Sequence, residues 1–182
     1  MNWATIEAAI AAWVRSASGL SDDGSVRWGE QNAAQSARPM IILRAMAVRG
    51  IGQDWVNVED NPAPEEGEEI LNIARGYREL TISIQCFAAS STGSSSARAI
   101  LENVRSRATL PTIRQALADA GVGLAPIGPV IAIDGVLGSA RFEPRATLEV
   151  RAFLASEVSE VGTYIEIVQA ENESTGSTFE VP

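Results

Sequence analysis

Hydrophobic and polar positions alternate with a period of two in two stretches of the chain, Thr81 to Phe87 and Thr147 to Phe153. Successive side chains of a β-strand point to opposite faces of the sheet, so this alternation predicts two strands that each have one buried and one solvent-facing side. The apolar rows consist of Ile82, Ile84 and Cys86, and of Leu148, Val150 and Ala152. The polar rows consist of Thr81, Ser83 and Gln85, and of Thr147, Glu149 and Arg151.

Apolar residues at helical spacing predict an amphipathic helix over residues 3–17. Asn2 can cap its first turn by accepting a hydrogen bond from a backbone N–H, and Gly19 stands just beyond its end. The tryptophans of this helix, Trp3 and Trp13, either pack on the sheet or anchor an interface with another protein. Packing on the sheet is the interpretation that we prefer.

Two further helices are predicted after the serine- and glycine-rich segment 88–96. The last serines of this segment can cap a helix that begins near Ala97. Leu110-Pro111 ends that helix and begins another, because proline suits the first turn of a helix. Gly121 is a suitable C-terminal stop for the last helix.

Strand patterns also occur between the first helix and the first alternating stretch. After a turn at residues 22–24, residues 26–28 are predicted to form a short strand. Residues 40–49 are mostly apolar on both faces, which is typical of a central strand. A helix is possible for this run, but the boundaries at Pro39 and Gly50 favour a strand.

An acidic segment rich in glycine and proline, residues 50–69, is predicted to be a long hairpin loop. Three of its residues can form a strand within it, namely Trp55, Val56 and Val58. A second strand is predicted to begin near Ile70 and to continue into the first alternating stretch.

The C-terminal part of the chain is predicted to contain a second hairpin. Residues 123–129 are expected to be irregular, and residues 130–133 to form a short strand. Asp134-Gly135 is a strong turn signal, and the partner strand is predicted over residues 140–154. Residues 164–168 can add a final strand.

The order of elements predicts the α+β class, with a mostly antiparallel sheet and helices packed on one face. At 182 residues the chain suits one sizeable core, so a single domain is expected over residues 1–170. Residues 171–182 are polar and acidic and are predicted to form a loosely ordered tail.

The composition excludes most catalytic apparatus, because the chain has no histidine and no lysine, and all 14 basic residues are arginine. Serine–histidine and cysteine–histidine pairs, imidazole metal ligands and Schiff-base lysines are therefore absent. The single cysteine, Cys86, lies on an apolar row and is interpreted as a buried small hydrophobic residue. We expect no cofactor, no metal site and no enzymatic activity.

The charge of −9 and the sequence pI of about 4.6 argue against a nucleic-acid clamp, which needs a basic surface. No apolar run reaches the roughly 18 residues that a membrane span requires, and the N-terminus lacks the basic region of a secretory signal. The protein is expected to be cytoplasmic or part of an assembly built in the cytoplasm.

Carboxylates are the only candidate acids or bases, and they are densest between Glu59 and Glu69. A pair of carboxylates held in a cleft can hydrolyse glycosides or bind a hard cation. Because this segment is rich in proline and glycine, a solvated loop is the interpretation that we prefer.

The polar rows of the two alternating strands are the candidate interface. Arg145 and Arg151 share a strand face with Glu149, which gives that face mixed charge. Such a face is either a solvated sheet surface or an intersubunit surface in which complementary charges set the register. The candidate interface residues are Thr81, Ser83, Gln85, Arg145, Thr147, Glu149 and Arg151.

Two strand entries carry a resemblance to a family, Gly76-Tyr77-Arg78-Glu79-Leu80-Thr81 and Gly138-Ser139-Ala140-Arg141-Phe142-Glu143-Pro144-Arg145-Ala146. With the tryptophan-containing first helix and Tyr164-Ile165-Glu166, they resemble the phage neck-terminator or tail-terminator proteins over residues 1–168. The resemblance implies a virion structural protein that assembles as a ring, typically a hexamer, at the head-proximal end of the tail tube.

Such a ring stops tube growth and joins the tail to the neck. The implied partners are further copies of the chain, the tail tube protein and a neck or head-completion protein, while genomic DNA passes through the lumen without specific binding. An acidic chain fits that passage, because it repels DNA. Two alternatives stay open, a head-completion or connector adaptor and, more remotely, a carboxylate-dependent hydrolase that uses Glu59 to Glu69.

Overall fold

The computed structural model describes residues 2–20, 25–29, 37–65, 67–90, 92–137, 141–163, 168–172 and 177–181. Its internal contacts divide the chain into two compact units. The first unit, called the body below, comprises residues 1–53 and 76–156. The second, called the acidic unit, comprises residues 54–75 and 157–182. The turn predicted at residues 22–24 lies outside the described residues.

Helix α1 (Trp3–Ser18) begins and ends where its local chemistry predicts. The Asn2 side chain accepts a hydrogen bond of 3.3 Å from the Thr5 N–H, which satisfies a donor that the helix itself leaves free. Gly19 ends the helix with a φ of 73°, in the left-handed region that glycine adopts without steric penalty. Trp13 is buried in the core as expected, whereas Trp3 is 37% exposed.

Helices α2 (Ala97–Arg107) and α3 (Pro111–Asp119) follow as predicted. The hydroxyl of Ser96 accepts a hydrogen bond from the Ala99 N–H and caps α2. Pro111 occupies the first turn of α3, where its missing N–H leaves no helical hydrogen bond unmade.

The body contains a six-stranded sheet in which β1 (Val26–Trp28), β2 (Met40–Asp60), β3 (Ile70–Phe87), β8 (Arg145–Gly162) and β4 (Val122–Leu124) are neighbours in that order, and β5 (Ile131–Ala132) also pairs with β8. β1 runs parallel to β2, whereas β4 and β5 run antiparallel to β8. β2, β3 and β8 each contribute residues to both units. The α+β class with a mostly antiparallel sheet is therefore confirmed.

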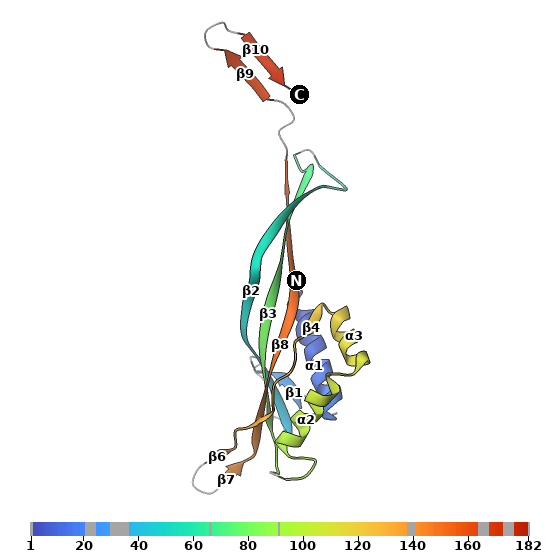
Figure 1. The fold of residues 1–182 in the computed structure, drawn as a ribbon, viewed down its shortest axis with the longest axis vertical. Helices are drawn as coiled ribbons and strands as arrows, with labels where there is room; N and C mark the ends of the chain where they lie inside the picture. Colours follow the sequence, from blue (N-terminus) through green and yellow to red (C-terminus); the bar gives the residue numbers. More distant parts are fainter. Residues whose placement is uncertain are drawn as a thin grey trace. The chain divides into compact units, whose positions relative to one another are not determined.

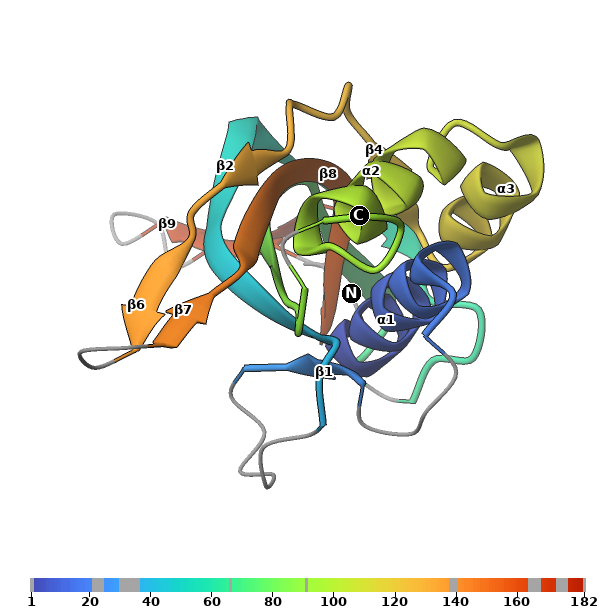
Figure 2. The same cartoon turned by 90° about the horizontal axis from the view of Figure 1, so that it is seen from below.

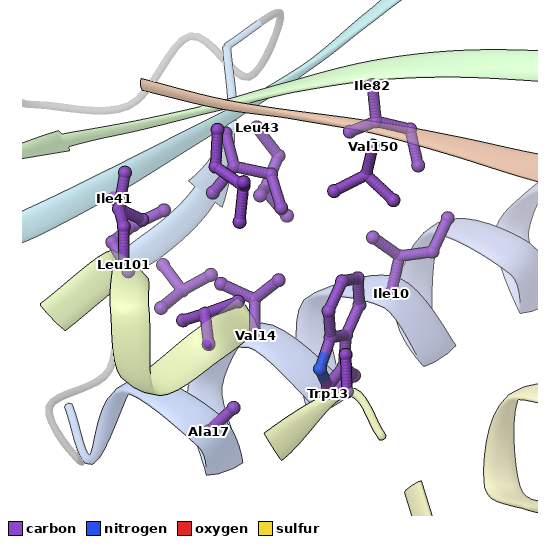
Figure 3. Close-up of a cluster of buried hydrophobic side chains, with 14 of the residues drawn as sticks. Ile10, Trp13, Val14, Ala17, Ile41, Leu43, Ile82, Leu101 and Val150 are labelled. Carbon is purple, nitrogen blue, oxygen red and sulfur yellow. The ribbon is translucent and has the colours of Figure 1, made fainter. Parts of the chain in front are cut away.

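The three helices pack on one face of the sheet (Figure 1, Figure 2). Both predicted apolar rows face them, because their six side chains are all fully buried. Ile10 and Val14 of α1 and Ile82 and Val150 of the sheet all belong to this core (Figure 3). Burial raises the pKa of the Cys86 thiol to about 12, since a thiolate would lose its hydration there. Cys86 is thus a buried free cysteine.

The predicted central strand over residues 40–49 is only partly correct. Ile41 and Leu43 are buried where β1 pairs with β2, but β1 ends there, and the residues of β2 from Arg44 onward are exposed. The predicted long loop over residues 50–69 is also wrong in its first half, because β2 continues to Asp60. The turn signals of Gly50 and Gly52 are overridden by the valines and the tryptophan that follow, which favour extended backbone.

The second hairpin differs from the prediction in its turn. Gly135 does not turn the chain but begins β6 (Gly135–Leu137), which pairs with β7 (Arg141–Glu143). The Asp134 carboxylate instead accepts a hydrogen bond of 2.9 Å from the Arg145 N–H. The expectation of irregular backbone over residues 123–129 is wrong at its start, because β4 pairs there with β8.

The acidic unit contains residues 54–60, 70–75 and 157–162 of the long strands, together with a hairpin of β9 (Val168–Asn172) and β10 (Ser177–Val181). The expectation of a loosely ordered tail from residue 171 is wrong, because β9 and β10 pair antiparallel from Asn172↔Ser177 to Val168↔Val181. Residues 164–167 of the predicted final strand lie outside the described residues. The domain boundary at residues 170–171 stays a prediction.

Candidate assembly surface

The polar rows of β3 and β8 lie on the sheet face opposite the helices. Thr81, Ser83 and Gln85 are half-buried on β3, since their apolar neighbours point into the core. On β8, Glu149 and Arg151 are exposed. The one-sided burial of both strands is therefore as the alternation predicts.

Four of the seven predicted interface residues surround one cavity of about 520 Å³, namely Ser83, Thr147, Glu149 and Arg151. Its other wall is the chain before and within β5, which contributes Pro126, Gly128, Pro129 and Ile131. Thr81 and Gln85 share the face but do not line this cavity. The polar face is thus partly covered by the chain itself, although Glu149 and Arg151 stay exposed.

Arg145 lies apart from this cavity and is engaged within the body. It forms an ion pair with Glu143, which also pairs with Arg38, and Glu143 is only 1% exposed. The Arg145 guanidinium also lies 4.9 Å from the centre of the Phe87 ring, a cation–π contact. Two arginines therefore offset the desolvation of one buried carboxylate.

A second buried carboxylate, Glu79, was not among the predicted interface residues. Glu79 of β3 lies 2.9 Å from Arg49 of β2 and 3.9 Å from Arg151 of β8, so the three charges cross three adjacent strands. Its position two residues before Thr81 is the signal that could have placed it on the polar face.

The unpaired edge of β2 is the main feature that the sequence did not reveal. β1 pairs only with residues 41–43 of β2, so among the described residues of the body β2 is the outermost strand from Arg44 to Gln53. Three large apolar side chains on this edge are exposed by 63%, 45% and 42%, namely Met46, Val48 and Ile51. Free strand edges with apolar side chains invite pairing with another chain.

Two of the carboxylates between Glu59 and Glu69 are engaged in contacts with neighbouring groups. Glu59 lies 3.1 Å from Arg75, which also lies 2.7 Å from Glu157 and whose pKa these carboxylates raise. Hydrogen bonds from the Gly67 N–H, the backbone of Glu69 and the Thr163 side chain lower the pKa of Glu69. A general acid at neutral pH needs the opposite shift. No three described His, Cys, Asp or Glu residues are arranged to hold a metal ion.

Charge is divided very unevenly between the two units. The acidic unit holds 13 of the 23 acidic residues and one of the 14 arginines, which gives it a formal charge of −12. The body, with 10 acidic residues and 13 arginines, carries +3. The overall charge of −9 therefore conceals two units of opposite formal charge.

The structure thus combines a sheet with helices on one face, a polar opposite face and, in the described part of the body, an apolar strand edge without a partner strand. The sequence model of a family described as phage neck terminator protein matches residues 4–177 of the 182, and the chain belongs to this family. It is thus a structural protein of the neck or tail of a phage particle, where it contacts other phage proteins. Among curated proteins, none matches the chain. No described helix combines the length and the apolar character that a membrane crossing requires.

Proposed function

We propose that copies of this chain form a ring, hexameric in the complete particle, at the head-proximal end of the tail tube. The ring stops growth of the tube and joins the tail to a neck or head-completion protein. The observation that carries this proposal is the free edge of β2 in the body, from Arg44 to Gln53, with three exposed apolar side chains. Membership of the neck terminator family supports the location.

The free edge supports assembly because a monomer would leave its backbone hydrogen-bonding groups and its apolar side chains in water. Natural proteins cover or blunt such edges, and the edge of β2 carries only Arg44 and Arg49 as blunting charges. A neighbouring copy of the chain that binds along the β2 edge would cover it. When one surface of each subunit binds a different surface of the next, the subunits form a closed ring if the successive rotations between neighbours add up to a full turn.

The polar face of the body is the second contact surface in this proposal. The exposed pair Glu149 and Arg151 either lines the lumen or meets the neighbouring copy, and the half-buried Thr81, Ser83 and Gln85 flank it. The acidic unit, with its formal charge of −12, repels passing DNA, because it has the same sign of charge as phosphate. This role requires no catalysis.

Native mass spectrometry of the full chain, alone and with tail tubes, tests the proposal. We expect rings of one mass on the tubes and loss of these rings in the Val48→Arg variant, which places a charge on the β2 edge. Ile133→Arg is the matched control, because Ile133 is 40% exposed and its N–H bonds to Arg145 of β8, which is separated from β2 by β3. A chain that stays monomeric on tubes, or one whose rings tolerate Val48→Arg, contradicts the proposal. A particle with the chain on the portal side alone would favour the adaptor alternative.

A further inference from the structure

A groove of about 610 Å³ lies in the body where the end of α2 and the start of α3 meet residues 126–127. Two arginines line it, Arg105 of α2 and Arg114 of α3, together with Ile127. The groove therefore combines two guanidinium groups with an apolar wall, which is a surface suited to an acidic segment.

The two arginines of the last turn of α2 are partly explained by their own helix, since cations there offset the partial negative charge of the helix end. Arg107 donates a hydrogen bond of 3.1 Å to the Ser16 carbonyl. Arg105 lies 3.3 Å from Glu102, but both side chains are about two-fifths exposed, and exposed pairs of this kind are weak. Arg105 is thus available to a stronger anion.

The position of Arg114 is not explained by the charge of its own helix. It is the fourth residue of α3, near the helix end whose backbone carries partial positive charge, and the first turn of α3 contains no acidic residue. Among the described residues it forms no ion pair. The groove therefore holds a guanidinium that its own helix disfavours, and an anion from outside the body would stabilise it.

The loop that joins β2 to β3 has the complementary chemistry. It is closed by a hydrogen bond of 2.9 Å from the Asn61 N–H to the Glu69 carbonyl and by one of 2.7 Å from the Asn61 side chain to the Glu68 carbonyl. Glu65 is exposed at its tip, and no basic residue occurs between residues 54 and 74. Two prolines, Pro62 and Pro64, restrict its backbone, so binding would order few additional residues.

We propose that this loop, residues 61–69, docks into the Arg105–Arg114 groove of a neighbouring copy. The charges of the units, −12 for the one that supplies the loop and +3 for the one that supplies the groove, favour this pairing over contacts between like units. Loop and groove are different surfaces of one chain, so the contact is head-to-tail, the kind that closes a ring. The inference rests on the proposed function and adds a further contact between its subunits to that made by the β2 edge.

Disulfide trapping tests the docking directly, because the only native cysteine is buried and its thiol has a raised pKa. The full chain receives Ala63→Cys in the loop and Ser106→Cys beside the groove, and is oxidised on tail tubes. We expect covalent ladders of two or more chains, and no ladder beyond a dimer for either single-cysteine variant. Adding Arg105→Glu and Arg114→Glu should slow ladder formation by at least about tenfold, because the docking charges then repel.

A charge exchange supplies the decisive control. Glu65→Arg and Glu68→Arg, combined with the two reversed arginines, should restore the rate of ladder formation that either pair of reversals alone slows. Rings that form on tubes without ladders would overturn this inference and leave the proposed function standing, as would a disulfide confined within single chains. The absence of rings under every condition would instead overturn the proposed function.

Discussion

The carboxylate of Glu79 lies 2.9 Å from the guanidinium of Arg49, and the two partners differ sharply in their exposure to solvent. The Glu79 side chain is 8% exposed, whereas that of Arg49 is 69% exposed. Because burial removes the hydration of a charge, losing the ion pair costs the buried carboxylate far more free energy than it costs the solvated guanidinium. The contact links β2 to β3 on the polar face of the body.

This asymmetry predicts unequal effects of removing each partner. Arg49→Ala leaves a buried carboxylate whose next cation, Arg151, is 3.9 Å away, so it should lower the free energy of unfolding by about 1–3 kcal/mol. Glu79→Gln leaves two solvated arginines and should lower the free energy of unfolding by less than Arg49→Ala does. Urea unfolding checks the order, with Arg98→Ala as an exposed control. An equal or larger loss for Glu79→Gln would contradict the role given to burial.

The apolar row of β3 should be the most sensitive part of the body. Ile84 is fully buried among helix and strand side chains, so Ile84→Ala removes buried surface and leaves a cavity, lowering the free energy of unfolding by about 2–5 kcal/mol. Val48→Ala on the exposed β2 edge should change it by less than about 0.5 kcal/mol in the isolated chain. Comparable losses in the two variants would mean that the row is not the core.

The Cys86 thiol should be inert in the folded protein. With a pKa of about 12, roughly one thiol in ten thousand is ionised at pH 8, and the sulfur is buried as well. Labelling with a thiol reagent should therefore require unfolding and should proceed at the rate of an ordinary thiol in 6 M guanidinium. Rapid stoichiometric labelling of the native chain would show that the β3 row is accessible.

The closure of the loop at residues 61–69 should depend on pH through Glu69. Hydrogen bonds to its carboxylate lower its pKa below the ordinary value of 4.5, so they stabilise the closed loop above that pH and are lost as pH falls through the lowered pKa. The amide resonance of Gly67, which donates a 2.8 Å hydrogen bond to this carboxylate, should shift with a midpoint below 4.5. Glu69→Gln should abolish the shift, and a midpoint above 4.5 would contradict the assignment.

Local chemistry was sufficient to predict the helices, because Asn2, Ser96 and Pro111 act on the first turns that they precede or begin. Alternation was sufficient to predict which faces of β3 and β8 are buried, since it depends on neighbours within the chain. The edge of β2 was beyond such reasoning. An apolar run like the one around Met46 fits a central strand and equally an edge strand that another subunit covers, so its sequence does not distinguish the two.

Pairing between residues far apart in the sequence explains the other differences between the predicted and the observed structure. By local rules, Asp134-Gly135 favours a turn. The pairs Ala132↔Ala146 and Gly135↔Glu143 show instead that Asp134 and Gly135 lie within one hairpin that continues beyond them. Pro144 lacks the N–H that a regular strand pair would use there, and the Asp134 side chain bonds the neighbouring Arg145 N–H instead. The Glu79 and Glu143 clusters depend on cross-strand register in the same way and were not predictable from spacing alone.

Electron cryomicroscopy of complete tails carrying this chain would locate its copies along the tail axis. We expect a closed ring of identical subunits at the head-proximal end of the tail tube, with the β2 edge of the body against a neighbouring copy. Density for the chain at another position along the tail, or as single subunits whose β2 edge faces solvent, would contradict it.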